Sequence, residues 1–179
     1  FDAEKPSTSF ATAISSSTFA SSMSMATGAP TFGTPEGGQA ISEMAALARR
    51  VGTPFRSGGQ FTASKYPDAQ AAYESSSTII PTVLSGVNFV LHAAGWQEGG
   101  LALGFEKLIL DADQLGFMDV YARGIDISEN GQAMEAFRTN PHGEHFLGIG
   151  HWVQNLVTAF AGSTVGVNNC LEQGTDVGS

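Results

Sequence analysis

The sequence predicts an α/β fold, a partial (β/α)8 TIM barrel in which parallel strands alternate with helices. Short apolar or β-branched runs recur along the chain, helix-length segments separate them, and glycines end both kinds of segment. The G-x-G-x-x-G pattern of dinucleotide-binding folds does not follow the first run. A full barrel takes about 250 residues, so the 179 residues of this chain predict an incomplete one. Further strands of a longer protein, or a second copy in a homo-oligomer, would cover its open edges.

Composition narrows the classes of partner. The formal net charge is −9 with only eight Lys and Arg, which disfavours nucleic acid because a polyanion is bound through clustered cations. No apolar run is long enough to span a membrane. A basic segment followed by an apolar segment is typical of a signal peptide, and this pattern does not occur, so no signal peptide is expected. Cys170 is the single cysteine, so no disulfide forms within the chain and a reducing, cytoplasmic setting is expected.

The first predicted unit joins a strand over residues 12–19 to a helix over residues 36–51. Thr34 and Pro35 suit the N-cap and the first helical position, and Gly52 suits the end of the helix. An apolar stripe at steps of three and four predicts the buried face of this helix. Its members are Ile41, Met44, Leu47 and Val51.

The second and third units repeat this order. A short strand is predicted over residues 53–56, followed by a helix from 67 to 85 that Pro81 kinks or splits. The third strand is predicted over 87–92, and after a glycine-rich loop its helix runs from 101 to 123.

Strand signals fade in the last third of the chain. Helices are predicted over 128–137 and 151–160, with a short strand or an irregular link over 145–150 between them. We expect residues 1–160 to form the partial-barrel domain and residues 161–179 to form a truncated polar tail.

Two polar residues mark the carboxyl edge of the predicted sheet. Arg56 and His92 each end a short strand and precede a loop that contains glycine. Ligands of α/β folds are bound beyond the carboxyl ends of the strands, so we expect these two side chains at one rim. An arginine there suits an anionic group, and a histidine suits hydrogen bonding or proton transfer.

Ordered motifs extend over nearly the whole chain, roughly residues 10–160. They are TGAPTFGTPE (27–36), GTPFRSGG (52–59), FTASK (61–65), PDAQAAYES (67–75), NFVLHAAGW (88–96), EGGL (98–101), FEK (105–107), DAD (111–113) and HFLG (145–148) with His151. In these motifs the chain resembles the C-terminal half of the trimethylamine methyltransferase family, the corrinoid-dependent methylamine and glycine betaine methyltransferases.

The resemblance implies a (β/α)8 barrel that transfers a methyl group from a quaternary or tertiary methylamine, such as glycine betaine or trimethylamine, to a corrinoid (cobalamin) on a separate protein. Cobalt(I) is a strong nucleophile, and a quaternary ammonium leaves as a neutral tertiary amine. Such an enzyme mainly has to orient the methyl carbon and exclude water. Some members of the family carry pyrrolysine, and this chain, which has none, resembles the members that act on quaternary amines.

The resemblance also implies roles for residues near the predicted strand ends. Arg56 would bind a substrate carboxylate through paired hydrogen bonds. Aromatic rings would face the substrate cation, and the candidates are Phe19, Phe61, Tyr66 and Trp96. The catalytic candidates are His92, which would contact the carboxylate or the corrinoid edge, and Glu98, which would balance charge in its loop.

Other interpretations of the same residues remain open. A TIM-barrel isomerase or lyase would bind a small carboxylate at this rim and use His92 as a base, and a truncated relative would bind betaine without turnover. Arg56 as a salt link between loops and the rings as core packing are the structural alternatives. His142, His145 and His151 lack the fixed pattern of acidic or cysteine partners that a metal requires, so no metal site is predicted.

Overall fold

The computed structural model describes residues 14–15, 23–159, 162–163 and 165. The chain forms two compact units, Phe1–Leu115 and Gly116–Ser179. The first unit holds the strands and the two helices that pack on them, and the second unit holds short helices. The predicted tail falls almost entirely outside the described residues and stays a prediction.

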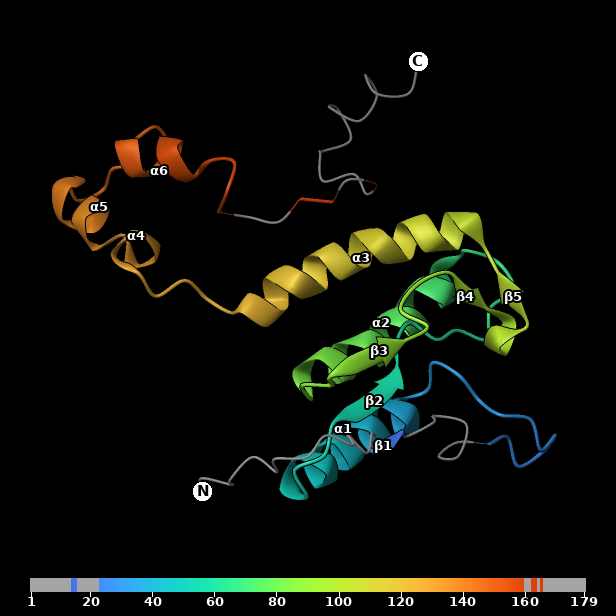
Figure 1. Cartoon of the computed structure of the whole chain (residues 1–179). Coiled ribbons are helices and arrows are strands. Elements are labelled where there is room, and N and C mark those ends of the chain that lie inside the picture. Colours follow the sequence, from blue (N-terminus) through green and yellow to red (C-terminus); the bar gives the residue numbers. More distant parts are fainter. Residues whose placement is uncertain (1–13, 16–22, 160–161, 164, 166–179) are drawn as a thin grey trace, which may run out of the picture. The chain divides into compact units, whose positions relative to one another are not determined.

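A three-stranded parallel sheet organises the first unit (Figure 1). Its strands are β1 (Ile14–Ser15), β2 (Phe55–Gly58) and β3 (Phe89–Leu91), in that spatial order. In the part of the chain that the structure describes, this sheet is open at both edges. The α/β class with parallel strands is therefore confirmed, whereas closure into part of a barrel stays a prediction.

Helix α1 (Pro35–Arg50) follows β1 and packs its small residues against β2. Ile41, Ala45 and Ala48 are buried together with Phe55, and Met44 and Val87 pack at the edge of this cluster. The predicted stripe is therefore correct at Ile41 and partly wrong beyond it. Leu47 and Val51 are about half exposed because the buried face follows the two alanines, whose small side chains allow the helix to lie close to the strand.

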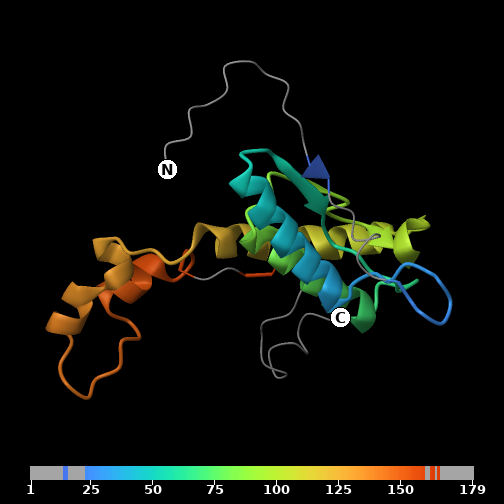
Figure 2. The same ribbon diagram turned by 90° about the horizontal axis from the view of Figure 1, so that it is seen from below.

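Helix α2 (Ala69–Leu84) lies beside α1 in both ribbon views (Figures 1 and 2). Asp68 caps it by accepting a hydrogen bond from the Ala71 amide. Pro81 lies inside the helix without splitting it. A Cβ at Gly38 would lie 3.0 Å from Cγ of Pro81, so glycine at this position of α1 allows the close approach of the two helices.

A hairpin separates the sheet from the third long helix. Strands β4 (Trp96–Gln97) and β5 (Ala102–Leu103) pair antiparallel across the 3-10 turn η2 (Glu98–Gly100), and helix α3 (Phe105–Arg123) follows. The predicted helix start at residue 101 is wrong. Gly99 and Gly100 reverse the chain with positive φ, which pairs residues 102–103 with β4 before the helix can begin.

The boundaries of β2 also differ from the prediction. The strand runs to Gly58 rather than ending at Arg56, because Ser57 and Gly58 pair in register with Val90 and Leu91 of β3. Gly58, which suggested a loop, therefore lies in the ladder, and Arg56 is the second residue of the strand.

The second unit contains the end of α3 and the short helices α4 (Glu129–Gln132), α5 (Met134–Thr139) and α6 (Gly150–Asn155). The single helix predicted over 128–137 is interrupted at Ala133, which has a left-handed backbone (φ 52°). Residues 145–149 form the irregular link considered there as the alternative to a strand, with a turn at residues 147–148. Side-chain amides of Asn130 and Asn155 bond reciprocally, and His151 Nε2 donates to the Asn130 carbonyl at 2.8 Å.

The core contact of α1 gives a first test. Ile41 is fully buried, so Ile41→Ala should lower the free energy of unfolding by about 2–5 kcal/mol, since it removes packing and leaves a cavity. Leu47→Ala on the same helix, where the side chain is half exposed, should cost below about 1 kcal/mol. Urea denaturation followed by circular dichroism measures both, and equal losses would contradict this account of the core.

The α2 cap predicts a pH dependence of stability. Its hydrogen bond from the Ala71 amide lowers the pKa of Asp68, so the ionised carboxylate stabilises the fold at neutral pH. This contribution should be present above about pH 4 and should be lost as the pH falls through the lowered folded-state value. Asp68→Asn keeps a capping oxygen but no charge. The difference in urea midpoint between wild type and this variant should shrink on acidification, and a pH-independent difference would contradict the assignment.

Candidate active site

The candidate site is built at the carboxyl edge of β2 and β3, where the chain leaves the sheet twice. The segment after Gly58 and the segment after Leu91 are joined by a hydrogen bond from the Gln60 amide to the His92 carbonyl, 3.1 Å long. Gly59 fits beneath this junction, because a Cβ there would lie 2.8 Å from the same carbonyl oxygen. The two loops therefore form one continuous surface.

Four rings from three segments of the chain meet on this surface. Phe32, Phe61 and Trp96 are buried together. Ring centroids lie 4.5 Å apart for Phe61 and Trp96 and 4.9 Å apart for Phe32 and Trp96, both edge to face. The His92 ring lies 5.6 Å from Trp96 and 5.8 Å from Phe61.

These spacings show that the rings contact one another. Centroid distances in this range are those of aromatic side chains in direct contact. The buried rings therefore pack on one another and form a floor, and their role toward a substrate cation stays a prediction. His92 is the exposed member of the group and forms its rim.

The backbone of the rim adopts conformations that side chains other than glycine rarely take. His92 has φ 58° and Glu98 has φ 47°, both in the left-handed region. Such residues persist where the surrounding structure determines them, and they concentrate at functional sites. Gly99 and Gly100 lie against the ring floor, since a Cβ at either would fall within 2.6 Å of Phe32 or Trp96.

Glu98 lies on the outer side of this loop. Its carboxylate is 3.4 Å from Lys65 Nζ, and its amide donates to the Ser64 carbonyl at 2.9 Å. Both charged side chains are partly exposed, so the pair contributes little to stability. Its geometric effect is to join the β2 loop to the hairpin turn.

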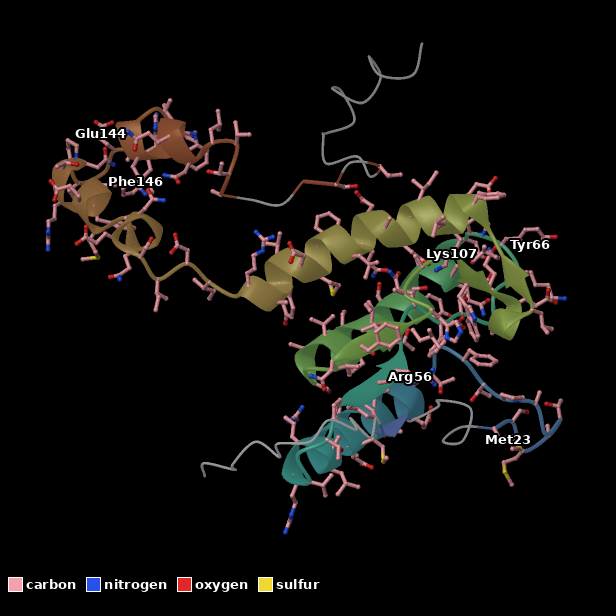
Figure 3. The ribbon with its side chains drawn as sticks, viewed as in Figure 1. Met23, Arg56, Tyr66, Lys107, Glu144 and Phe146 are labelled. Carbon is pink, nitrogen blue, oxygen red and sulfur yellow. The ribbon has the colours of Figure 1, made fainter. Side chains whose placement is uncertain are left out.

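Arg56 extends from β2, half-buried, on the sheet face opposite Phe55 (Figure 3). It pairs in register with Phe89, and His92 lies three residues beyond Phe89. The two side chains therefore start about 10 Å apart along the strand direction. Arg56 lies lower on the sheet than the sequence suggested.

Of the other two aromatic candidates, the structure describes only Tyr66. Tyr66 is 72% exposed, at the outer edge of the β2 loop (Figure 3). Phe19 lies outside the described residues, and its assignment stays a prediction.

A buried carboxylate on α2 holds the β2 loop in place. Oε2 of Glu74 accepts hydrogen bonds from the Thr62 hydroxyl at 2.7 Å and the Ala63 amide at 2.8 Å. Its stem also contacts Gly33, where a Cβ would lie 2.3 Å from Cβ of Glu74. One side chain thus fixes the loop that carries Phe61 and packs beside the loop that carries Phe32.

A buried ion pair on α3 holds the β3 loop. Lys107 Nζ bonds both carboxylate oxygens of Asp111 and donates to the Ser75 hydroxyl of α2 at 2.9 Å. Asp111 Oδ2 accepts a hydrogen bond from the Gly95 amide at 2.8 Å. Burial raises the pKa of the Asp111 carboxyl, while the bonds from Lys107 and Gly95 oppose that rise.

Sequence reasoning missed Phe32, Glu74 and the Lys107–Asp111 pair as parts of this site. Phe32, Lys107 and Asp111 lie inside motifs singled out above, but a motif does not say which side chains meet. Glu74 offered a signal of its own, because it is the single charge in a helix otherwise made of small, polar and apolar residues.

The described residues hold neither a cluster of metal-ligand side chains nor a membrane-spanning helix. No group of three or more His, Cys, Asp or Glu lies close enough there to hold a metal ion. Among the described helices, none combines the length and the apolar character needed to cross a membrane.

Comparison with known proteins identifies the family. The family model described as trimethylamine methyltransferase (MTTB) matches residues 10–179. A glycine betaine methyltransferase of Desulfitobacterium hafniense (strain Y51) is 42% identical over 131 residues, which is 73% of this chain and 27% of that protein. The trimethylamine methyltransferase MttB of Methanosarcina barkeri (strain Fusaro / DSM 804) is 32% identical over 117 residues, 65% of this chain and 23% of that protein.

The chain therefore belongs to the trimethylamine methyltransferase family, as its motifs predicted. It spans about a quarter of the length of these curated relatives. The family model covers the aromatic floor, the His92 rim and both helix-borne supports.

The Glu74 support gives a test of how the site is held. Glu74→Ala should lower the free energy of unfolding by about 1–3 kcal/mol, because the buried Thr62 hydroxyl and the partly buried Ala63 amide lose their acceptor. Glu43→Ala on α1 removes an exposed carboxylate and should change the free energy of unfolding by about 0.5 kcal/mol or less. Urea denaturation of both variants measures these changes. A Glu74 variant as stable as the Glu43 variant would contradict the role of Glu74 in holding the β2 loop.

Proposed function

We propose that this protein transfers a methyl group from a quaternary or tertiary methylamine to the cobalt of a corrinoid carried by a separate protein. Membership of the trimethylamine methyltransferase family carries the proposal. The relative of 42% identity is named a glycine betaine methyltransferase, which favours a quaternary amine that bears a carboxylate.

Transfer of a methyl group from a quaternary amine requires little acid–base catalysis by the protein. The carbon–nitrogen bond of the quaternary ammonium breaks with its electron pair going to nitrogen, a neutral tertiary amine leaves, and the methyl carbon bonds to cobalt(I) of the partner's corrinoid. With a quaternary substrate no proton is transferred. The protein has to align the methyl carbon with the incoming cobalt and exclude water.

The rim residues suit these demands. In this proposal the exposed His92 ring, held against the buried floor, contacts the substrate at the mouth of the site, and the floor supplies an apolar surface that excludes water. The left-handed backbone of His92 fixes where its ring stands before substrate arrives, which lowers the cost of ordering it. Glu98 acts through its bridge to Lys65 by fixing the turn that follows Trp96.

Arg56 is assigned to the substrate carboxylate. It projects from the sheet face that the two helices leave uncovered, and a guanidinium binds a carboxylate through two parallel hydrogen bonds. Arg56 lies on the strand below His92, and its long side chain is suited to reach toward the rim that His92 forms.

The test is methyl transfer to cob(I)alamin, followed by the absorbance of methylcobalamin, with glycine betaine and with tetramethylammonium as donors. Arg56→Ala should weaken the use of glycine betaine about 10- to 100-fold, the loss of a charge-assisted hydrogen bond, and should leave tetramethylammonium unaffected. Arg50→Ala, at the exposed end of α1, is the matched control and should change neither donor.

The outcomes separate the parts of the proposal. Absence of methylcobalamin with both donors contradicts methyl transfer. An unchanged KM for glycine betaine in Arg56→Ala contradicts the carboxylate assignment alone.

A further inference from the structure

We propose that the buried Lys107–Asp111 pair is a positioning device that sets the His92 rim from α3. The inference rests on the proposed function for its link to catalysis, whereas the contacts that define the device stand by themselves. It assigns a role to two residues of α3 that are not members of the ring floor.

The pair is enclosed on all sides. Lys107 is 1% exposed and Asp111 is 3% exposed. The ammonium donates to Asp111 and to Ser75 of α2, which is itself fully buried. The second carboxylate oxygen accepts from the Gly95 amide. The pair is thus bonded to another helix and to the loop after β3.

Stability alone is a weak reason for such a pair. Removing two charges from water opposes their attraction, and well-packed apolar replacements are often as stable. What apolar side chains cannot supply is an acceptor for the Gly95 amide. This amide lies three residues after His92 and one before Trp96, inside the rim segment.

The same turn of α3 reaches the β2 loop. The Asp111 backbone carbonyl accepts from Gln60 Nε2 at 2.9 Å, and the Gln60 amide donates to the His92 carbonyl. Both connections from Asp111 therefore end beside His92, one through Gly95 and one through Gln60. This convergence explains how a strained histidine backbone is maintained at the rim.

The close packing around Gly95 agrees with a fixed position for the segment that follows His92. Gly95 has φ 81°, and a Cβ there would lie 2.7 Å from Leu103 of β5 and 3.4 Å from Leu108 of α3. Gly104 donates to the Gly95 carbonyl at 3.0 Å. Gly95 is therefore fixed by hydrogen bonds at its amide and its carbonyl and by close packing around its Cα. Loss of the Asp111 contact should therefore loosen the backbone of residues 92–96.

The experiment replaces both charges together, Lys107→Met with Asp111→Leu. The thermal midpoint of the variant should fall by only a few degrees, because apolar packing replaces the ion pair while the Gly95 amide loses its acceptor. Amide hydrogen exchange at Gly95 should accelerate about tenfold or more, and kcat for methyl transfer from glycine betaine should fall by a similar factor. The control is Asp119→Leu with Arg123→Met, an ion pair of the same spacing on the same helix that is 60–73% exposed, and it should change none of these.

Two single variants keep the inference open to refutation if the double variant does not fold. Asp111→Asn retains an oxygen that can accept from Gly95, whereas Asp111→Ala does not, and both remove the charge. Gly95 exchange should be slower in the Asn variant by about tenfold. Equal exchange in the two variants, or an unchanged Gly95 in the double variant, overturns the inference.

The proposed function and this inference fail in different ways. Wild-type protein that forms no methylcobalamin contradicts the function, while the Gly95 exchange still decides the positioning role. Fast Gly95 exchange together with unchanged kcat overturns the link to the rim.

Discussion

Buried backbone amides at the carboxyl edge of the sheet must find acceptors, and helix side chains supply them. The ladder between β2 and β3 ends at Gly58 and Leu91, so amides in the loops that follow need other acceptors. The buried amides of Phe61 and Gly95 bond instead to Thr78 and Asp111, and the partly buried amide of Ala63 bonds to Glu74. Because an unpaired buried amide is costly, these three helix residues determine the shape of the loops.

The candidate site follows from that constraint. With the loops fixed, the rings of Phe32, Phe61 and Trp96 can pack as a rigid floor under an exposed His92. The glycines of the hairpin turn allow the backbone to lie against this floor. Order at the rim thus comes from helices on the far side of the loops, which is how a site on irregular backbone is kept in one geometry.

Much of the architecture could be read from the sequence because it depends on local patterns. Pro35, Asp68 and the apolar runs predicted α1, α2 and the parallel strands to within a few residues. The hairpin was not predicted, since two-residue strands carry too little pattern and their pairing depends on residues on either side of a turn. The left-handed backbone at Ala133 that interrupts the predicted helix has no signature in composition either.

The sequence by itself determined the alternation of strands and helices and, through its ordered motifs, the family to which the chain belongs. Tertiary structure alone decided which side chains meet: that Phe32 joins the rings, that Arg56 starts below His92 on the sheet, and that Lys107 and Asp111 turn inward. The physical reason is that periodicity and capping act between near neighbours in the chain. Burial and hydrogen-bond satisfaction depend on segments brought together only by folding.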